Sequence, residues 1–256
     1  MDKWDISQNN IESLENQLND RSVLIFSFGS IEPAGKYLPL GTDLLIANSI
    51  TPLIANKSKC FYLPTVPFGD TLEMSKDSYK IHIKEQVLNS YCLEAVNSLS
   101  TKFNKIIFIS YHSLNNIALN NVCRKLKDEG TDISLIDWWK VVGTVGKPYF
   151  SDTPYPTGHG SEMITSVMMA LKPELVNLPK EKVIEPKKNL PYYLNHLPNG
   201  TSPCWVYGNF DDYSSQTTWG NLEQTNIAKG EKLISLSIDY ICSFIETFKD
   251  LKRSNK

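Results

Sequence analysis

Apolar runs of strand length alternate along this chain with stretches of helical periodicity, and this alternation constrains the fold more than any other feature. The runs are "VLIFSF" at 23–28, part of "KCFYLPTVPFG" at 59–69, "KIIFIS" at 105–110 and "DISLIDWW" at 132–139. The first run is apolar enough to be a strand covered on both faces, as in parallel sheets. Strands and helices in alternation predict an α/β fold with parallel strands and right-handed crossovers.

Helices are expected between and after these runs. The stretches with helical spacing lie at 42–57, 83–102, 116–130 and 161–171, and within 222–252. In the second stretch, an apolar face is predicted from the recurrence of Val87, Tyr91, Ala95 and Leu99. Thr42 or Asp43 is placed to cap the first helix, and Gly130 is placed to end the third.

Two stretches lack both periodicities. The segment "GTVGKPYFSDTPYPTGHG" at 143–160 is expected to be irregular, and the proline-rich segment at roughly 172–221 is expected to form loops over the surface. No linker rich in Pro, Gly or Ser and no charge run divides the sequence. We therefore expect a single domain over 1–256.

The composition excludes several classes of protein. A formal net charge of −2, with lysines spread along the chain, leaves no basic face for nucleic acid. No apolar run approaches the roughly 18 residues that a membrane span needs, and "MDKWDISQNN" lacks the apolar region of a signal peptide. The five cysteines lie far apart, without a C-x-x-C pair, which argues for reduced thiols. We expect a cytoplasmic protein without nucleic-acid or membrane partners.

Polar clusters follow three of the predicted strands. The loop "GSIEPAGKYLPLGTD" after the first strand contains Glu32 and Asp43, "YHSLNN" after the third strand contains His112, and "TGHGSE" after the fourth contains His159. In parallel sheets, ligands bind where the loops at the carboxyl ends of the strands converge. The sequence therefore predicts one site that these four residues share.

Each of these residues also has a structural interpretation. Asp43 could cap the next helix, Glu32 could close a turn, and His112 could bond a neighbouring loop. His159 lies between two glycines and could simply be a helix-entry residue. Taken together, however, Glu32, Asp43 and His112 form an O/O/N set that suits Mn²⁺, Zn²⁺ or Fe²⁺.

Other candidate features point to structure rather than chemistry. His82 and His196 have no polar cluster around them and are interpreted as structural. The aromatic runs "IDWWK" and "CWVYGNF" are interpreted as core and interface residues. The chain has no G-x-S-x-G, Walker loop, H-E-x-x-H or dinucleotide fingerprint.

The loop at 29–43 resembles the signature of the creatininase (creatinine amidohydrolase) family, G-S-x-E-Q-H-G-P-H-L-P-x-G-T-D. Four further segments resemble family patterns in the same order. "LPTVPFG" is similar to L-P-x-x-x-Y-G, "FISYHSLNN" to a strand followed by N-G-H-x-x-N, "GHGSEMITSVMMALKPELV" to H-A-G-x-x-E-T-S followed by P-E-L-V, and "WGNLEQTNIAKGEKLI" to G-(D/N)-P-x-x-A-T-x-x-K-G. The resemblance covers about residues 20 to 245.

This resemblance implies a three-layer α/β/α sandwich with a mainly parallel central sheet, usually assembled into a homohexamer. It also implies divalent-metal hydrolysis of a cyclic or linear amide C–N bond in a small-molecule substrate. Glu32, Asp43 and His112 match the ligands of the family's first metal. His159 matches the histidine that assists proton transfer.

The chain departs from the family at the second metal. Ala34 stands at the position of a ligand histidine, and Tyr37 stands at the second histidine of the same loop. Leu114 replaces an acidic residue found in some members, and Ile164 replaces the glutamate of E-T-S. Alanine, leucine and isoleucine bind no metal. The resemblance therefore implies one divalent ion (Zn, Mn or Fe) and a lost second position.

Three more residues are expected to contact substrate: Tyr111, Tyr37 and Glu162. Glu162 lies two positions from Ile164 on the same predicted helix, which turns it about 200° away, so it is not expected to replace the missing ligand.

Two functions follow from this pattern. The first is a one-metal hydrolase with His159 as general acid and base. It is favoured because random loss of site residues would not be expected to leave all three ligands of one metal in place. The second is a non-catalytic homologue kept as a binding or structural subunit. The aromatic-rich loops at 138–155 and 192–219 exceed what one core needs, which favours a homo-oligomer in either case.

Overall fold

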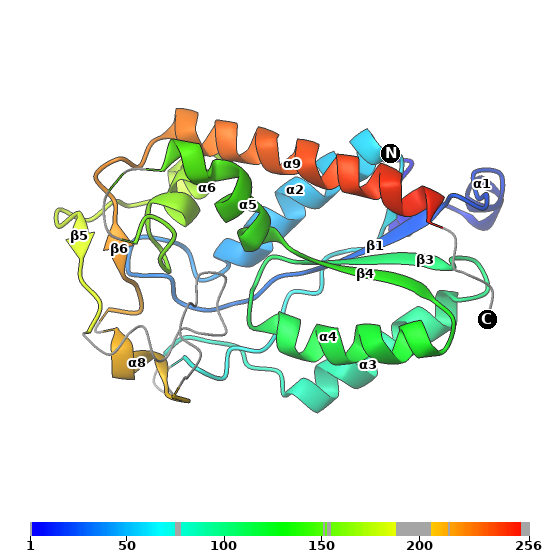
Figure 1. Ribbon diagram of the computed structural model, residues 1–256, viewed down its shortest axis with the longest axis horizontal. Helices are drawn as coiled ribbons and strands as arrows, with labels where there is room; N and C mark the ends of the chain where they lie inside the picture. The colour runs from blue at the N-terminus through cyan, green and yellow to red at the C-terminus, as the bar shows by residue number, and fades with distance from the viewer. Residues whose placement is uncertain are drawn as a thin grey trace.

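A four-stranded parallel sheet forms the centre of the protein (Figure 1). The computed structural model describes residues 2–74, 78–150, 152, 155–187, 206–214 and 216–251. The strands are β1 (Val23–Phe28), β2 (Phe61–Tyr62), β3 (Lys105–Ser110) and β4 (Asp132–Asp137). Their order across the sheet is β2-β1-β3-β4. The α/β prediction is confirmed, and two of the strands have the bounds predicted from the sequence.

The strand predicted at 59–69 is much shorter than expected. Only two of its residues pair as β2, and a single bridge between Phe28 and Val66 continues the contact with β1. Pro64 and Pro67 flank that bridge. Because proline has no N–H to donate to the ladder, a regular strand cannot continue through this segment.

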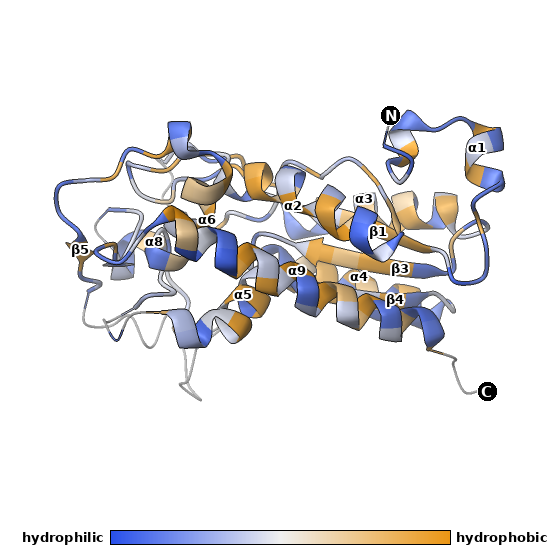
Figure 2. Cartoon of the chain, turned by 90° about the horizontal axis from the view of Figure 1, so that it is seen from above, coloured by the Kyte–Doolittle hydropathy of each residue, from blue (hydrophilic) through white to orange (hydrophobic). Residues whose placement is uncertain are grey.

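Helices cover both faces of the sheet. In Figure 1, one layer contains α2 (Thr42–Ser58), α5 (Trp138–Gly146), α6 (Glu162–Leu171) and α9 (Ile227–Asp250), and the other contains α3 (Glu85–Leu99) and α4 (Asn115–Asp128). Alternate residues of β1 enter two separate cores: Val23 and Ile25 face the first layer, whereas Leu24 and Phe26 face the second. Figure 2 shows hydrophobic residues along the sheet between these layers. This is the predicted three-layer α/β/α sandwich.

Short elements complete the described residues. They are η1 (Ile6–Gln8), α1 (Ile11–Glu15), η2 (Lys147–Tyr149), η3 (Pro173–Leu175), β5 (Val183–Ile184), α8 (Phe210–Tyr213) and β6 (Gly220–Asn221). Strands β5 and β6 pair antiparallel, apart from the central sheet. Within the ranges described, none of the helices has the length and apolar character that a bilayer span requires.

The apolar face predicted for α3 is right in part, because Ala95 and Leu99 pack against the core but Val87 and Tyr91 do not. Val87 and Tyr91 are 57% and 55% exposed, whereas Leu88, Cys92 and Val96 are buried in the core. Both sets recur every four residues, so helical spacing alone does not distinguish them. Packing against β3 and α4 decides which of the two stripes faces inward.

The run "DISLIDWW" ends its strand two residues earlier than predicted. Asp137 accepts a hydrogen bond from the backbone N of Lys140 at 3.1 Å and caps α5, which begins at Trp138. The segment predicted to be irregular from residue 143 therefore starts inside a helix. The side-chain cap outweighs the strand preference of the two tryptophans. The predicted cap of α2 is also wrong, because Gly41 is its N-cap, without a side-chain hydrogen bond.

Two helical glycines offer a matched test of the packing. A Cβ at Gly230 of α9 would lie 1.9 Å from the backbone O of Ser166 in α6, whereas a Cβ at Gly143 of α5 would meet no atom within 4 Å. We expect Gly230→Ala to lower the free energy of unfolding by about 2 kcal/mol. We expect Gly143→Ala to raise it by about 1 kcal/mol, because alanine favours the helix. Denaturant unfolding measures both, and equal stability of the two variants would contradict the close α6–α9 crossing.

Candidate metal centre

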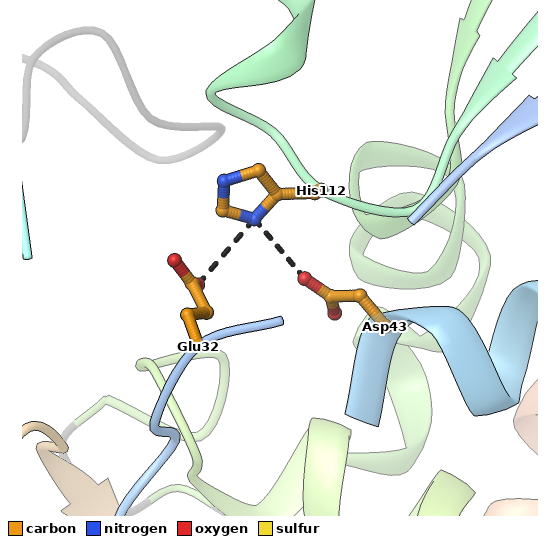
Figure 3. A group of neighbouring side chains, drawn as sticks. All are labelled: Glu32, Asp43 and His112. Carbon is orange, nitrogen blue, oxygen red and sulfur yellow. Dashed lines mark hydrogen bonds and ion pairs between the residues drawn. The ribbon is translucent and has the colours of Figure 1, made fainter. Parts of the chain in front are cut away.

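Three buried ligand-type side chains converge at the carboxyl ends of β1 and β3. Glu32 follows β1, Asp43 lies in the first turn of α2, and His112 follows β3; they are 4%, 9% and 5% exposed. Figure 3 shows Nδ1 of His112 pointing between the two carboxylates, 3.0 Å from Asp43 Oδ2 and 3.4 Å from Glu32 Oε1. One ligand atom from each residue lies within 4.8 Å of the others. The structure thus brings together the set that the sequence predicted.

Hydrogen bonds fix the carboxylate of Asp43. Ser30 Oγ donates to its Oδ2 at 2.9 Å, and Trp139 Nε1 approaches its Oδ1 at 3.3 Å. The same indole N–H donates more closely to the backbone O of Tyr111, at 2.7 Å. Asp43 is therefore held by its neighbours in the site, rather than serving as the helix cap that was one reading of the sequence.

The tautomer of His112 is set by a backbone carbonyl. Its Nε2 lies 2.6 Å from the backbone O of Asp70, and this oxygen can only accept a hydrogen bond. Nε2 therefore carries the proton, and in the neutral ring the lone pair of Nδ1 faces the carboxylates. Metal-binding histidines are commonly oriented in this way by a hydrogen bond at the other ring nitrogen.

The surroundings of Glu32 test whether a cation fits. Its Oε2 is buried and, among the described residues, has no hydrogen-bond partner. Burial raises the pKa of Glu32 above its usual range, the charge of His112 opposes this, and Asp43 adds to it. Burial lowers the pKa of His112, but the two carboxylates outweigh it and raise that pKa overall. A divalent cation would satisfy the unpartnered oxygen and balance both carboxylates, so the donor set fits such an ion.

Asn115 holds the carbonyl that orients His112. Its fully buried side chain accepts from the backbone N of Asp70 at 2.8 Å and donates to the backbone O of Gly29 at 3.1 Å. A Cβ at Gly69 would lie 2.0 Å from the Asn115 Oδ1 atom, so the loop packs tightly on this amide. Asn115 thereby connects the end of β1 to the loop whose Asp70 carbonyl contacts His112.

We expect Asn115→Ala to weaken divalent-ion binding about ten-fold, because outer hydrogen bonds of this kind orient the ligand ring. Asn116→Ala is the matched control, since the Asn116 amide donates to Asp137 instead, at 2.7 Å. Competition with a chelator measures both affinities, with circular dichroism to check folding. Equal ion affinity in Asn115→Ala and the native protein would show that the Asp70 carbonyl is held without this amide.

His159 reaches the edge of the same site from the loop before α6. Its Nε2 lies 3.0 Å from the backbone O of Pro33 and 4.0 Å from Glu32 Oε1. The rings of Phe210 and Trp219 pack around it, with centroids at 4.9 and 5.8 Å. Burial lowers the pKa of His159, which the bond to Pro33 opposes. The imidazole is thus held neutral at neutral pH and beside the ligand set.

A cavity of about 770 Å³ opens above these four residues. Ala34, Leu114 and Ile164, the predicted replacements of metal ligands, all line it. The rest of the lining includes Met74, Met163, Phe210, Tyr213, Trp219, Trp139, Glu73, Lys140, Thr144 and Lys147. The lining is mostly apolar, with charged and hydroxyl side chains among it.

The three residues expected to contact substrate do not line this cavity. Tyr37 is buried and donates to the backbone O of Gly160 at 2.6 Å. Tyr111 is fully buried and packs on Trp138, and Glu162 is fully buried in an ion pair with Lys229. Their polar atoms are satisfied inside the protein, which places them behind the cavity wall.

The remaining histidines are consistent with structural roles where they are described. His82 lies 3.4 Å from the carboxylate of Asp70 and 3.3 Å from the backbone N of Thr71. His196, Cys204 and much of the aromatic-rich segment at 192–219 lie outside the described residues.

Sequence reasoning missed the aromatic part of the site. Trp138 is core, as expected, but Trp139 lines the cavity and contacts Asp43. Phe210, from the second aromatic run, packs on His159. The position of "WW" just after a strand, where ligands gather in parallel sheets, was the available signal for Trp139. No comparable signal marks Phe210, the first residue of α8.

Comparisons with known proteins identify the family and the fold. The sequence profile of the family described as Creatininase (Creatinine amidohydrolase) matches residues 7–245. A mycofactocin precursor peptide peptidase from Mycobacterium ulcerans (strain Agy99) is 26% identical over 162 residues, which is 60% of this chain and 60% of that relative.

Solved structures show the same fold. A proposed creatinine amidohydrolase from Bacteroides fragilis NCTC 9343 is 25% identical, with full coverage of both chains and a TM-score of 0.77. A creatinine amidohydrolase (creatininase) is 16% identical, with 97% of this chain and 99% of that chain covered and a TM-score of 0.78. Other solved creatininases are named for manganese and for a zinc–zinc form. With its profile match over nearly the whole sequence, this chain belongs to the creatininase family.

Proposed function

We propose that this protein is a hydrolase that cleaves an amide C–N bond with one divalent ion, held by Glu32, Asp43 and His112. The observation that carries the proposal is the convergence of these three buried donors on one point at the base of a cavity. Three protein ligands with open positions are typical of a catalytic ion. The carbon side chains of Ala34 and Leu114 in the lining favour a single ion.

The residues around this point have distinct roles in such a reaction. A bound divalent ion would supply Lewis acidity and lower the pKa of a coordinated water. Asp70 and Asn115 keep the Nδ1 lone pair of His112 turned toward the carboxylates. His159, held neutral by its burial, accepts a proton from the attacking water and returns it to the leaving nitrogen. The mostly apolar lining strengthens these electrostatic effects.

Two kinds of amide are consistent with the site. The family is named for creatinine, a small cyclic amide, whereas the mycobacterial relative is named as a peptide peptidase. A cavity of about 770 Å³ lies within the usual range for ligand sites, roughly 300–1,000 Å³. A small amide or the end of a peptide fits this volume.

A non-catalytic homologue is the second candidate. It is favoured by one observation: Nε2 of His159 is bonded to the backbone O of Pro33 and lies 4.0 Å from Glu32. A general base would have to leave that carbonyl, or work through its other nitrogen. Under this candidate, the cavity binds a ligand without turning it over. The homo-oligomeric state and the cytoplasmic location expected from the sequence stay predictions under both candidates.

Metal content separates these candidates most directly. After incubation with Mn²⁺ or Zn²⁺ and desalting, we expect one tightly bound ion per chain, because the second position would have only the shared Asp43 and His159. The loaded protein is then incubated with short peptides and N-acyl amides, and amine release is followed by mass spectrometry. Two tightly bound ions per chain would contradict the prediction that ligands for only one ion remain. No ion after both incubations would favour the non-catalytic homologue.

A further inference from the structure

One face of α5 forms a wall of the cavity. Lys140, Gly143 and Thr144 of α5 line it, and so does Lys147, the C-cap residue of α5 that begins η2. The opposite face of α5 is buried, and a Cβ at Gly146 would lie 2.4 Å from the Leu233 side chain of α9. Lys140 therefore lies on the cavity side of α5 and Lys147 directly after its end, whereas the apolar side of α5 faces the core.

Unlike several other lysines, Lys140 and Lys147 form no close ion pair among the described residues, although burial raises the pKa of the nearby Asp137 and the charge of Lys140 opposes this rise. Lys229 pairs with Glu162, and Lys105 pairs with Asp132 at 3.2 Å. Within the described ranges, no ion pair includes Lys140 or Lys147, and both are exposed. Their charges are therefore available to a ligand that enters the cavity.

The position of α5 ties these lysines to the metal centre. Its first turn contains Trp139, whose Nε1 lies 3.3 Å from Asp43 Oδ1. The helix rises 1.5 Å per residue, so Lys147 lies about 10 Å farther along it than Lys140. Long flexible side chains at these two positions can converge on one anion beside the centre.

The other walls would repel an anion or contact an apolar group. Glu73 lines the cavity and accepts from the hydroxyl of Tyr213 at 3.2 Å, so its charge disfavours an anion on that side. Tyr213 belongs to a buried aromatic cluster with Phe210 and Trp219. In Figure 1, α8, which contains Phe210 and Tyr213, is seen well apart from α5. The cavity thus separates an apolar wall from a cationic one.

We propose that Lys140 of α5 and Lys147 at its C-cap bind a carboxylate of the substrate. The inference rests on the proposed amide hydrolysis and narrows its substrate class. The substrate is an amide that carries an apolar group for the aromatic wall and a carboxylate for α5. An N-acyl amino acid or the carboxyl end of a peptide has this chemistry. The two negative charges of Glu32 and Asp43 neutralise a bound divalent ion. The metal centre therefore has no net negative charge that would compete with a substrate carboxylate for the two lysines.

Two probes that differ only in charge test this subsite. N-acetyl-L-phenylalanine carries the carboxylate, and N-acetyl-L-phenylalaninamide is its neutral counterpart. Binding to the full-length protein is measured by ligand-observed NMR, with and without Zn²⁺. With Zn²⁺, we expect the acid to bind roughly ten-fold tighter than the amide, since two charged donors contact it. Without Zn²⁺ the preference should be smaller, because the charges of Glu32 and Asp43 are then not balanced by an ion.

Lysine substitutions then locate the preference. In the Lys140→Gln/Lys147→Gln protein, we expect the acid and the amide to bind equally, with the affinity of the amide unchanged. Lys125→Gln, at the far end of α4, is the matched control and should keep the preference for the acid. If the double variant keeps the preference, or if the native protein has none, the inference is wrong. A lysine-dependent preference in a protein that hydrolyses no amide would leave the subsite standing and refute the proposed hydrolysis instead.

Discussion

His112→Ala is expected to abolish tight divalent-ion binding. The ring of His112 supplies the nitrogen of the donor set, and its Nδ1 lies within 3.4 Å of both carboxylates. Its removal leaves two buried carboxylates with no nitrogen ligand, which should weaken binding roughly 100-fold or more. Metal analysis after desalting should fall from one ion per chain to near zero, and calorimetry with Mn²⁺ measures the loss of affinity.

His82→Ala is the matched control for this loss. His82 contacts the carboxylate of Asp70 but none of the three ligands, so the variant should keep its ion. Thermal unfolding of both variants without metal checks that they fold. Full metal content in the His112→Ala protein would show that the buried histidine is not a ligand and would remove the basis of the proposed function.

The largest expected effect on catalysis is that of His159→Ala. This variant should keep the ion, since His159 lies outside the three-ligand set, and should lose about 10²- to 10⁴-fold in turnover. Metal content and rate are measured on the same preparation. Loss of the ion together with activity would make His159 a ligand rather than a proton-transfer group.

The pH profile gives a second check on His159. Burial lowers its pKa below the ordinary value of 6.5. A general base acts in its neutral form, so activity should rise with pH through this lowered pKa. In the native protein, the midpoint of the acid limb should therefore lie at a pH below the ordinary histidine pKa. In the His159→Ala variant, this limb should change. An acid limb above pH 7 in the native protein would contradict a buried neutral base.

The sequence by itself determined the fold class and the position of the site. Two apolar runs predicted the bounds of β1 and β3, because a strand covered on both faces must be apolar at nearly every position. Parallel topology then brings the loops after neighbouring strands to one edge of the sheet. That rule predicted that Glu32 and His112 would meet, although 80 positions separate them in the chain.

Local periodicity did not determine which side chains face inward. Helical spacing fitted both the exposed Tyr91 stripe and the buried Cys92 stripe of α3, and only packing against the second core distinguished them. Tyr111 and Glu162 lie next to site residues in sequence, yet their partners are Thr51 and Lys229 behind the cavity wall. A side chain's direction depends on neighbours that are distant in sequence, which a pattern of nearby residues does not contain.

Only the tertiary structure decided how the histidines of the site are held. Neither the carbonyl of Asp70, which fixes the tautomer of His112, nor Phe210, which packs on His159, follows from any sequence motif. The first contact is made by the loop that contains Asp70 and the second by α8, and tertiary packing sets the position of both. The physical reason is that residue types determine which chemistry is available, whereas protonation and orientation depend on atoms supplied by remote parts of the chain.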